Sequence, residues 1–552
     1  MFYKMKKILI ILCLCFALQL RAENNDNRYF EIAKNMELFT QLYKELNTYY
    51  VDDVDPNKLM TDGIDKMLDG LDPFTNYITG ADLDEYRLQT TGKYGGIGAR
   101  IGKIGDFVVI TDPYEGFPAQ KAGLKAGDII KKIDGKVATK YNSEDVSQLL
   151  RGEPGTNINI TVEDPITKQE RTVTFKREEI KIDNVPYHGM VNNNIGYIKL
   201  ESFTENAANE VQNALIDLKK NPNLKGVILD LRGNGGGLLA EAIDICNTFV
   251  DKGTNIVDTK GKIAEANYSY ATKGKPVDTQ IPLAVLTDGG SASASEIVSG
   301  SMQDLDRGVI IGQNTYGKGL VQVTKPLPYK AKLKVTISKY YIPSGRCIQR
   351  IDYTHRSADG IASALPDSLR KEFKTKAGRI VKDGAGIEPD IKTEQDKIAP
   401  ITIALYTKNH IFDFANLYRH DHDTLRDGNN FKMNDAEYES FKSFLKGKEY
   451  DYQTPTEVKL EDLKKSIKDD DYSDEAQKVI TDLEAQIKHD KSKDLDKFKP
   501  EIERILSEEI VSRYNYQEGR IANSLLDDKD VEKAIQVLTD QAQYKSILSA
   551  KK

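Results

Sequence analysis

Five short apolar runs, separated by helix-like stretches, constrain the fold of this 552-residue chain more than any other feature. Short apolar runs bounded by turn residues are typical of buried strands, and strands that alternate with helices form a mixed α/β sheet. We therefore expect residues 179–395 to form an α/β core. The five runs span residues 195–200, 226–231, 283–287, 309–312 and 333–341.

The segments on either side of this core differ from it in composition. In residues 23–90, apolar residues recur at steps of three and four, and this spacing predicts helices. Residues 91–178 hold short strand-like runs between glycine turns and predict a compact β-rich module. Residues 396–552 are charged, with separate apolar stripes at helical spacing, and predict a helical extension. The stripe in the first segment consists of Ile32, Met36, Phe39, Tyr43 and Leu46.

Residues 1–22 have the layout of a secretory signal peptide. Three lysines precede an apolar run from Ile8 to Leu18, and the segment ends at the small residue Ala22. A membrane-spanning helix needs about 20 apolar residues, and this run is shorter. We expect an exported, periplasmic protein, which would stay associated with the membrane only if the segment were not cleaved.

The remaining chain is acidic and poor in cysteine. The first 22 residues hold four basic residues and no acidic one, so cleavage changes the formal net charge from −7 to −11. An acidic chain does not favour nucleic-acid binding. Only Cys246 and Cys347 remain, too few for a disulfide framework or a cysteine zinc site. We expect neither a nucleic-acid partner nor a metal.

The stretch "TDGGSASASEIVSG" carries three serines at alternate positions, between a strand-like and a helix-like run. A serine at a strand-to-helix turn exposes its hydroxyl at the helix N-terminus, where the next backbone N–H can stabilise an oxyanion. Ser293 fits this role best, with Ala294 as the donor, because alanines on both sides leave room for a substrate. The alternative is that all three serines only cap the helix and stabilise the turn.

Lys318 is the candidate base for this serine, because no histidine lies near it in the sequence. It stands between Gly317 and Gly319, with an apolar strand-like run on each side. A lysine that acts as a base near neutral pH needs a pKa lowered from about 10.4 toward about 7, which burial among apolar groups can supply. The side chain of Gln322 could accept a hydrogen bond from the amine and hold it in line.

Two glycine loops allow other interpretations. The stretch from Gly312 to Lys318 resembles a phosphate-binding loop, but Gly319 replaces the required Ser or Thr and a strand-like run follows. "LRGNGGGLL" lacks the third glycine of a dinucleotide fingerprint, because Leu238 stands in its place. We therefore expect no nucleotide cofactor. In the second loop, Gly236 or Gly237 can instead offer a second N–H to an oxyanion, with Gly236 as first choice.

The β-rich module begins with a glycine turn suited to binding a carboxylate. Successive backbone N–H groups in such a turn can form a nest for an anion. With "FPAQKAGLKAGDIIKKIDG" downstream, the module resembles a PDZ domain, and the resemblance implies recognition of the free C-terminus of another polypeptide. The residues of the turn are Tyr94, Gly95, Gly96, Ile97 and Gly98.

Together, "LRGNGGG", "GSASASEI", "TYGKGLVQ" and "GIEPDI" resemble the carboxyl-terminal processing peptidases, also called tail-specific proteases, a family of serine peptidases with a PDZ domain. The resemblance implies a crotonase-like (ClpP/crotonase) α/β core with an inserted PDZ domain. It carries the nucleophile to Ser293, the base to Lys318 and the supporting glutamine to Gln322. It also carries the oxyanion donors to Ala294 and Gly236. Glu296 and Asp304 match acidic family positions, for which we expect helix capping and salt bridging.

The resulting hypothesis is an exported serine endopeptidase that cleaves unfolded or tailed polypeptides near their C-termini. Two alternatives are a catalytically silent peptide-binding scaffold and an acyl-CoA enzyme of crotonase type, which would need no PDZ domain. Residues 350–385 and 396–552 exceed the shortest family members, so association into a homo-oligomer or with an adaptor protein stays open. Arg151, beside the module, is a candidate contact between peptide binding and catalysis.

Overall fold

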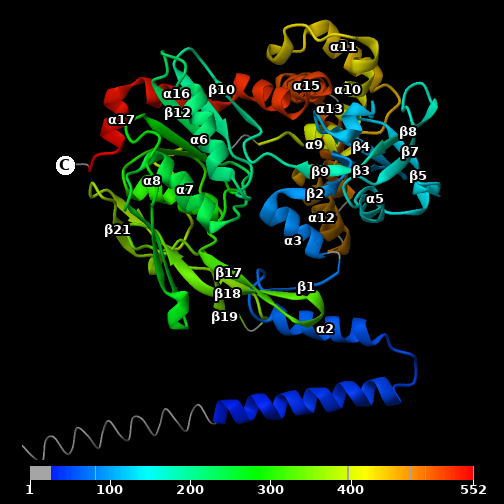
Figure 1. Cartoon of the computed structure of the whole chain (residues 1–552). Helices are drawn as coiled ribbons and strands as arrows, with labels where there is room; N and C mark the ends of the chain where they lie inside the picture. Colours follow the sequence, from blue (N-terminus) through cyan, green and yellow to red (C-terminus); the bar gives the residue numbers. More distant parts are fainter. Residues whose placement is uncertain are drawn as a thin grey trace, which may run out of the picture. The chain divides into compact units, whose positions relative to one another are not determined.

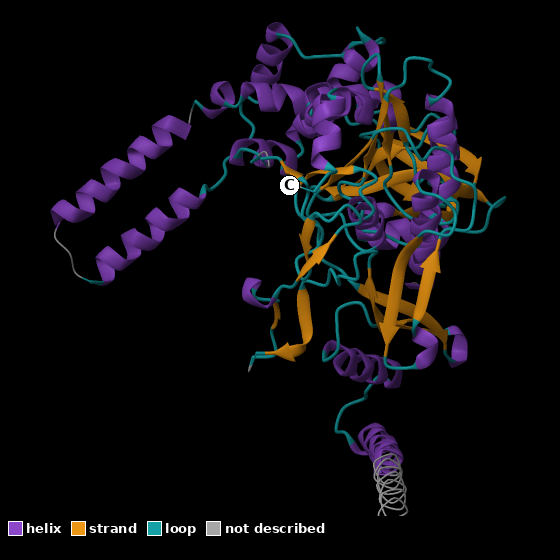
Figure 2. Cartoon of the chain, turned by 90° about the vertical axis from the view of Figure 1, so that its left-hand side faces the viewer, coloured by secondary structure: helices purple, strands orange, loops and turns teal. Residues whose placement is uncertain are grey.

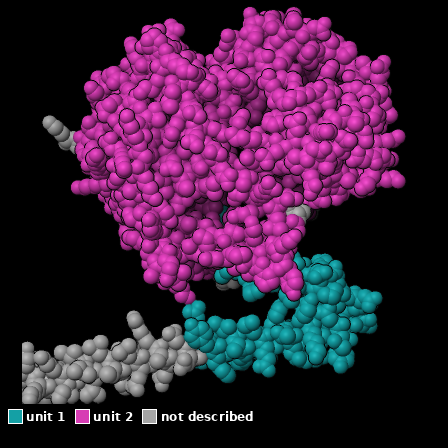
Figure 3. All heavy atoms as spheres, in the orientation of Figure 1, with its two compact units in different colours: residues 1–77 teal, residues 78–552 magenta. Residues whose placement is uncertain are grey.

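The computed structural model describes residues 27–80, 82–357, 359–394, 397–470, 474–491 and 493–550. The predicted signal peptide, residues 1–22, lies outside the described residues. The chain divides into two compact units, residues 1–77 and 78–552, which Figure 3 distinguishes by colour. Among the described residues, no helix combines the length and the apolar content needed to cross a membrane.

The first unit is helical. A helix covers residues 27–49, and α2 (Pro56–Asp69) follows it. The carboxylate of Asp55 caps α2 by accepting from the backbone N–H groups of Asn57 and Lys58. The Tyr43 hydroxyl donates to the Pro56 carbonyl at 2.7 Å, which ties the two helices together. The short strand β1 (Asn76–Ile78) follows in the sequence.

The second unit begins with α3 (Asp82–Thr91) and then a β-rich module. The strands of its sheet are antiparallel neighbours in the order β3-β4-β5-β7-β8, so β3 lies at an edge. A separate pair, β2 with β9, joins the two ends of the module. The elements are β2 (Lys93–Gly96), β3 (Ala99–Ile104), β4 (Phe107–Pro113), α4 (Pro118–Lys121), β5 (Ile129–Ile133), β6 (Lys136–Val137), α5 (Ser143–Leu150), β7 (Asn157–Glu163), β8 (Glu170–Lys176) and β9 (Glu178–Lys181).

A sheet with strand order β10-β11-β12-β15-β16-β23 forms the centre of the α/β core. All neighbouring pairs are parallel except β10 with β11. Strands buried on both faces are apolar along their whole length, which explains why four of the five apolar runs could be recognised in the sequence. The strands are β10 (Tyr187–Met190), β11 (Ile195–Lys199), β12 (Gly226–Asp230), β15 (Leu283–Thr287), β16 (Val309–Gly312) and β23 (Ile391–Lys392).

Helices cover both faces of this sheet (Figure 1). α6 (Ala207–Leu218), α7 (Leu239–Phe249) and α8 (Ala294–Asp304) pack on one face. α16 (Lys529–Thr539) and α17 (Gln541–Ile547) pack on the other, although more than 130 positions of sequence separate them from β23. The last segment of the chain therefore supplies one layer of the α/β core.

The fifth apolar run lies in a second, antiparallel sheet, where β17, β18, β13 and β14 are neighbours in that order. Two hairpins follow within residues 350–385, β19 with β20 and β21 with β22. Arg379 of the second hairpin donates to the carboxylate of Asp306 and to the carbonyl of Gln303, at the end of α8. The strands are β13 (Asn255–Gly261), β14 (Tyr268–Ala271), β17 (Leu320–Pro326), β18 (Lys332–Tyr341), β19 (Ile351–Arg356), β20 (Ala362–Ala364), β21 (Glu372–Lys374) and β22 (Ile380–Lys382).

Residues after β23 form a helical region with its own core. α12 and α13 run side by side as a hairpin (Figure 2), and Lys464 and Glu484 form an ion pair of 2.7 Å between them. α15 has non-helical backbone at Asn515 and Tyr516. The helices are α9 (Pro400–Thr407), α10 (His410–Asp421), α11 (Asp435–Phe444), α12 (Pro455–Asp469), α13 (Asp474–Lys491), α14 (Asp494–Lys497) and α15 (Lys499–Ser524).

Candidate active site

One cavity of about 590 Å³ brings together the candidate catalytic residues from three separate segments of the chain. The start of α8 contributes Ala294 and its N-cap Ser293, the loop before β17 contributes Lys318, and the glycine loop after β12 contributes Gly236. Gln322 lines the same cavity from β17. α3 also contributes, through Tyr86, Gln89 and Thr90.

Ser293 stands at the turn from β15 into α8 with unusual backbone geometry. Its φ is +55° and its ψ is −111°, a region that costs a residue other than glycine on the order of 1–3 kcal/mol. Its neighbours Ser291 and Ser295 have structural roles, because their hydroxyls donate to the carbonyls of Leu231 and Asn234 at 2.8 Å. Of the three serines, Ser293 alone lines the cavity.

A buried carboxylate, Glu296, holds the serine and the lysine segments in place. Its Oε2 accepts from the backbone N–H groups of Ser293 and Lys318, each at 2.8 Å. Its Oε1 accepts from the Gly317 N–H at 2.7 Å and from the Thr315 hydroxyl at 2.6 Å. Burial raises the pKa of this carboxyl to about 7, although the four hydrogen bonds act to lower it.

The lysine loop is held by close backbone contacts. Gly317 has φ +89°, and a Cβ on it would lie 2.5 Å from the Cβ of Arg350, so a larger residue does not fit. A Cβ on Gly319 would lie 2.9 Å from the backbone nitrogen of Gln349. The Tyr340 hydroxyl donates to the Lys318 carbonyl and lies 3.1 Å from the Ser293 carbonyl. The loop before β17 is therefore as tightly positioned as the serine turn.

Gln322 lies on β17 at the point where the pairing with β18 shifts by one residue. Its amide donates to the hydroxyl of Thr336 at 3.0 Å. This bond leaves the carbonyl oxygen of the same amide as the group that can accept from an amine.

The glycine loop lies directly against the serine turn. A Cβ on Gly236, whose φ is +98°, would lie 2.8 Å from the Cβ of Ser293 and 2.9 Å from the nitrogen of Ala294. The Gly236 N–H donates to Oδ1 of Asn234 at 2.9 Å, so it does not point at an incoming oxyanion in this conformation. The N–H groups of Gly237 and Ala294 have no hydrogen-bond partner among the described residues.

Two residues that the sequence analysis missed, Asp288 and Asn234, join the glycine loop to the serine turn. Asp288 Oδ1 accepts from the backbone N–H groups of Gly233 and Gly290, each at 2.9 Å. The Asn234 carbonyl accepts from the Ala292 N–H at 3.0 Å, and its side chain donates to the Leu200 carbonyl at 2.8 Å. Asn and Asp side chains stabilise turns in this way. The Asn and the Asp inside the glycine-rich stretches could therefore have indicated these roles in the sequence.

Arg232, at the start of the glycine loop, connects it to the last part of the chain. Its guanidinium donates to Asp230 and Asp528, with shortest distances of 2.7 Å, and to Asp530 at 3.0 Å. Desolvation acts to raise the pKa of the buried Asp230 carboxyl, but the positive charges of Arg232 and Lys199 hold this pKa well below its usual range. Asp528 is also the N-cap of α16, so this helix and the glycine loop share one anchor.

The predicted peptide-binding turn does not line this cavity. Tyr94, Gly95 and Gly96 lie on β2, and Gly98 has φ +73°. Burial raises the pKa of the Tyr94 hydroxyl above its usual range. Arg151 joins this turn to α3: its guanidinium lies 5.4 Å from the centre of the Tyr94 ring, and its Nη2 lies 3.8 Å from Oε2 of Glu85.

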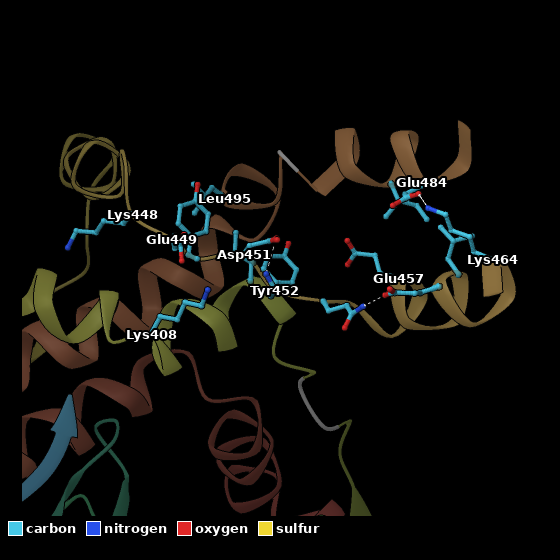
Figure 4. Close-up of a pocket in the computed structure, with 15 residues that line it drawn as sticks. Lys408, Lys448, Glu449, Asp451, Tyr452, Glu457, Lys464, Glu484 and Leu495 are labelled. Carbon is cyan, nitrogen blue, oxygen red and sulfur yellow. Dashed lines mark hydrogen bonds and ion pairs between the residues drawn. The ribbon is translucent and has the colours of Figure 1, made fainter. Parts of the chain in front are cut away.

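A larger cavity of about 1060 Å³ lies in the C-terminal helical region (Figure 4). Two of its lining residues, Lys464 and Glu484, form an ion pair, and none of the predicted site residues lines the cavity. Within the described part of the chain, no group of three or more His, Cys, Asp or Glu side chains is placed to hold a metal ion.

Comparison with known proteins identifies the family. Residues 194–356 match Peptidase family S41, residues 109–164 match the PDZ domain, and residues 401–538 match the family described as "Probable PDZ-protease, C-terminal helical domain". A "Carboxy-terminal-processing protease" of Bartonella bacilliformis is 36% identical over 61% of this chain and 77% of its own length. The chain belongs to this family of proteases. A "Probable CtpA-like serine protease" of Staphylococcus aureus is 34% identical over 57% of this chain and 62% of its own.

Carboxy-terminal-processing proteases of family S41 are serine-type peptidases, so the prediction of a serine peptidase is confirmed. The expected PDZ domain and the mixed α/β architecture are confirmed as well, and the substrates are polypeptides. Among solved structures, the photosystem II D1 C-terminal processing protease is 27% identical over 65% of this chain and 92% of its own, with a TM-score of 0.35. A PDZ domain of a Vibrio cholerae carboxy-terminal protease, solved with a peptide, is 26% identical over 16% of this chain and 99% of its own, with a TM-score of 0.16.

Proposed function

We propose that this protease hydrolyses peptide bonds with Ser293 as nucleophile and Lys318 as general base. The observation that carries the proposal is the single carboxylate, Glu296, that accepts from the backbone N–H groups of both residues beside one cavity. In a neutral state, Lys318 Nζ takes the proton of Ser293 Oγ while that oxygen attacks the carbonyl carbon of the substrate.

The proton then moves to the leaving amine as the carbon–nitrogen bond breaks, which leaves an acyl-enzyme. Water attacks the ester, Lys318 accepts a proton from the water and returns it to Ser293 Oγ, and the carboxylate product leaves. Gln322 orients the lysine through its side-chain carbonyl. Ala294 supplies one oxyanion donor, and the glycine loop supplies the other. Gly236 fills that role if it exchanges its bond to Asn234, whereas the Gly237 N–H needs no such exchange.

We also propose that the PDZ domain binds the C-terminus of the substrate. β3 is an edge strand beside α5, so an extended peptide can add to the sheet there. Its terminal carboxylate would sit at the turn formed by Tyr94, Gly95, Gly96, Ile97 and Gly98. Export to the periplasm rests on the predicted signal peptide. We propose further that the core is crotonase-like. The PDZ domain would span residues 91–178, the peptidase core residues 179–395 and the helical extension residues 396–552.

The test is cleavage of an unfolded protein with an apolar C-terminus by the purified mature chain, with fragments identified by mass spectrometry. Ser293→Ala and Lys318→Ala should each abolish cleavage. The cavity offers matched controls, because Ser202 and Lys334 line it as well, and Ser202→Ala and Lys334→Ala should keep most of the activity.

Cleavage that survives in Lys318→Ala and disappears in Lys334→Ala would show that Lys334, and not Lys318, is the base. Peptide binding without cleavage by the wild type would favour a silent PDZ scaffold. Cleavage that no longer depends on the substrate's C-terminus would contradict the role of the PDZ domain.

A further inference from the structure

The hairpin of β17 and β18, residues 320–341, is basic in a chain that is acidic as a whole. Between Asp306 and Asp352 the sequence has nine basic residues and no acidic one, whereas the formal net charge of the chain is −7. Five of the nine are lysines of the hairpin, and none of these five forms an ion pair with a described residue. Their charges can therefore attract an anionic partner. The five are Lys325, Lys330, Lys332, Lys334 and Lys339.

The end of the hairpin, residues 325–330, which we call the tip, places apolar side chains between two of these lysines. Its sequence is KPLPYK. Tyr329 is 98% exposed, the highest value among the large apolar side chains in the described part of the chain. Tyr329 and Lys330 also have positive φ, +58° and +63°, where hairpin turns favour Gly, Asn or Asp because larger side chains strain the backbone. Such strain does not stabilise the fold and is typical of sites that bind a ligand.

The tip lies beyond the contacts that β13 and α3 make with the hairpin. The pairing of β18 with β13 ends at Ser338, whereas β17 and β18 stay paired as far as Pro326 and Lys332. From α3, the Tyr86 hydroxyl lies 2.9 Å from that of Thr324, and Lys332 lies over the Tyr86 ring. The six residues of the tip come after these contacts, and all six are exposed.

Lysines on either side of an exposed leucine and tyrosine suit the surface of an anionic lipid membrane. Tyrosine favours the headgroup region, because its ring contacts apolar carbon there while its hydroxyl stays in water. Lysines beside it attract anionic lipids, and each one strengthens binding about fivefold. A nucleic-acid site would instead be rich in arginine and in side-chain amides, both of which the tip sequence lacks.

We propose that the hairpin of β17 and β18 binds an anionic membrane surface through its tip. Leu327 and Tyr329 enter the headgroup region, and Lys325 and Lys330 contact the lipid phosphates. Other residues of the same hairpin line the active-site cavity, so the bound protease holds that cavity about 20 Å from the bilayer, at 3.3 Å per strand residue. This favours substrates whose C-termini lie close to a membrane. The proposal does not depend on the catalytic dyad, because binding is measured without turnover.

The first experiment is sedimentation of the purified mature chain with vesicles of equimolar phosphatidylglycerol and phosphatidylcholine. The wild type should bind these vesicles and should not bind pure phosphatidylcholine. Lys325→Gln/Lys330→Gln should bind about 25-fold more weakly, at about fivefold per lysine. Lys136→Gln/Lys140→Gln removes the same charge from exposed positions of the PDZ domain and should bind like the wild type.

Tyr329→Gly separates a loss of binding from a loss of folding. Glycine adopts φ +58° without strain, so this variant should unfold at no lower temperature than the wild type. It should nevertheless bind the anionic vesicles more weakly, because the aromatic ring is gone.

A tryptophan can report insertion directly, because the chain has none of its own. The fluorescence of Tyr329→Trp should shift to shorter wavelength when anionic vesicles are added, and that of Tyr406→Trp, at an exposed position of α9, should not.

Three results would overturn the proposal. One is a wild type that does not bind anionic vesicles. Another is equal binding by the wild type, Tyr329→Gly and Lys325→Gln/Lys330→Gln, because a different surface would then hold the vesicles. The third is binding to soluble polyglutamate as tight as that to vesicles, with no fluorescence shift in Tyr329→Trp, which would identify an acidic polypeptide as the partner.

Discussion

Ser293 and Lys318 are connected through one atom, Oε2 of Glu296, to which both of their backbone N–H groups donate at 2.8 Å. The serine turn follows β15 and the lysine loop precedes β17, so without this bridge each could shift independently. A displacement of a reacting group by 1 Å can cost about 100-fold in rate. The position of Ser293 relative to Lys318 therefore depends on one buried side chain, that of Glu296.

Gly236→Ala should abolish cleavage without preventing folding. The new Cβ would lie 2.8 Å from the Cβ of Ser293, and φ +98° strains any residue with a side chain. Gly235→Ala is the matched control in the same loop, because a Cβ there meets nothing within 4 Å. Turnover and thermal unfolding of both variants provide the measurement. Full activity in Gly236→Ala would mean that the glycine loop does not approach the substrate's carbonyl.

Glu296 should make the stability of the protein depend on pH between about 4.5 and 7. Burial raises its pKa from 4.5 to about 7, so in this window the folded protein binds a proton that the unfolded chain has lost. The free energy of unfolding should therefore fall as the pH rises through the window and level off above it. Urea titrations at several pH values compare the wild type with Glu296→Gln, which has no proton to lose. If the two curves run parallel from pH 4.5 to 7, the carboxyl is not the titrating group.

Arg151→Ala should slow the cleavage of substrates with a recognised C-terminus and leave tailless peptides unaffected. Arg151 contacts Tyr94 at the predicted peptide-binding turn and Glu85 on α3, a helix that lines the active-site cavity. Arg171→Ala removes a different arginine of the module, which pairs with Asp128, and should change neither rate. Equal turnover of tailed and tailless substrates by the wild type and Arg151→Ala would end this hypothesis.

Asp528→Asn should lower kcat several-fold with little change in KM. Asparagine caps a helix as well as aspartate does, so α16 keeps its N-cap, but the ion pair with Arg232 beside the glycine loop is lost. Asp540→Asn makes the same change at the N-cap of α17, where the carboxylate accepts from Ala542 and Gln543, and should leave kcat unchanged. A loss of thermal stability with unchanged kcat would limit Asp528 to a structural role.

That the candidate residues lie together could be predicted from the sequence, because a serine at a strand-to-helix turn and a glycine loop each have a short signature. Ser293, Lys318 and Gly236 do line one cavity. The role of Glu296 could be predicted only in part. Its position three residues after Ser293 indicated a helix cap, but its bonds to Thr315, Gly317 and Lys318 depend on a loop that no local pattern connects to α8.

The contribution of α16 to the core could not be recognised for a similar reason. Its buried residues Val531, Ala534, Val537 and Leu538 form a stripe like those of the preceding charged helices. A stripe shows that a helix is covered on one side, but it does not show which surface covers it. Here the surface is the far face of the central sheet, which includes Ile228 and Leu286.

That arrangement has a consequence for the order in which the core can be completed. The strands β11 to β16 are made early, but the helices that cover their second face are made only after about 200 further residues. Until residues 529–547 emerge, one side of the sheet and the Asp528 anchor of the glycine loop are missing. A chain that lacks residues 528–547 is therefore expected to be inactive, because its sheet is bare on one face and its glycine loop has lost the Asp528 partner of Arg232.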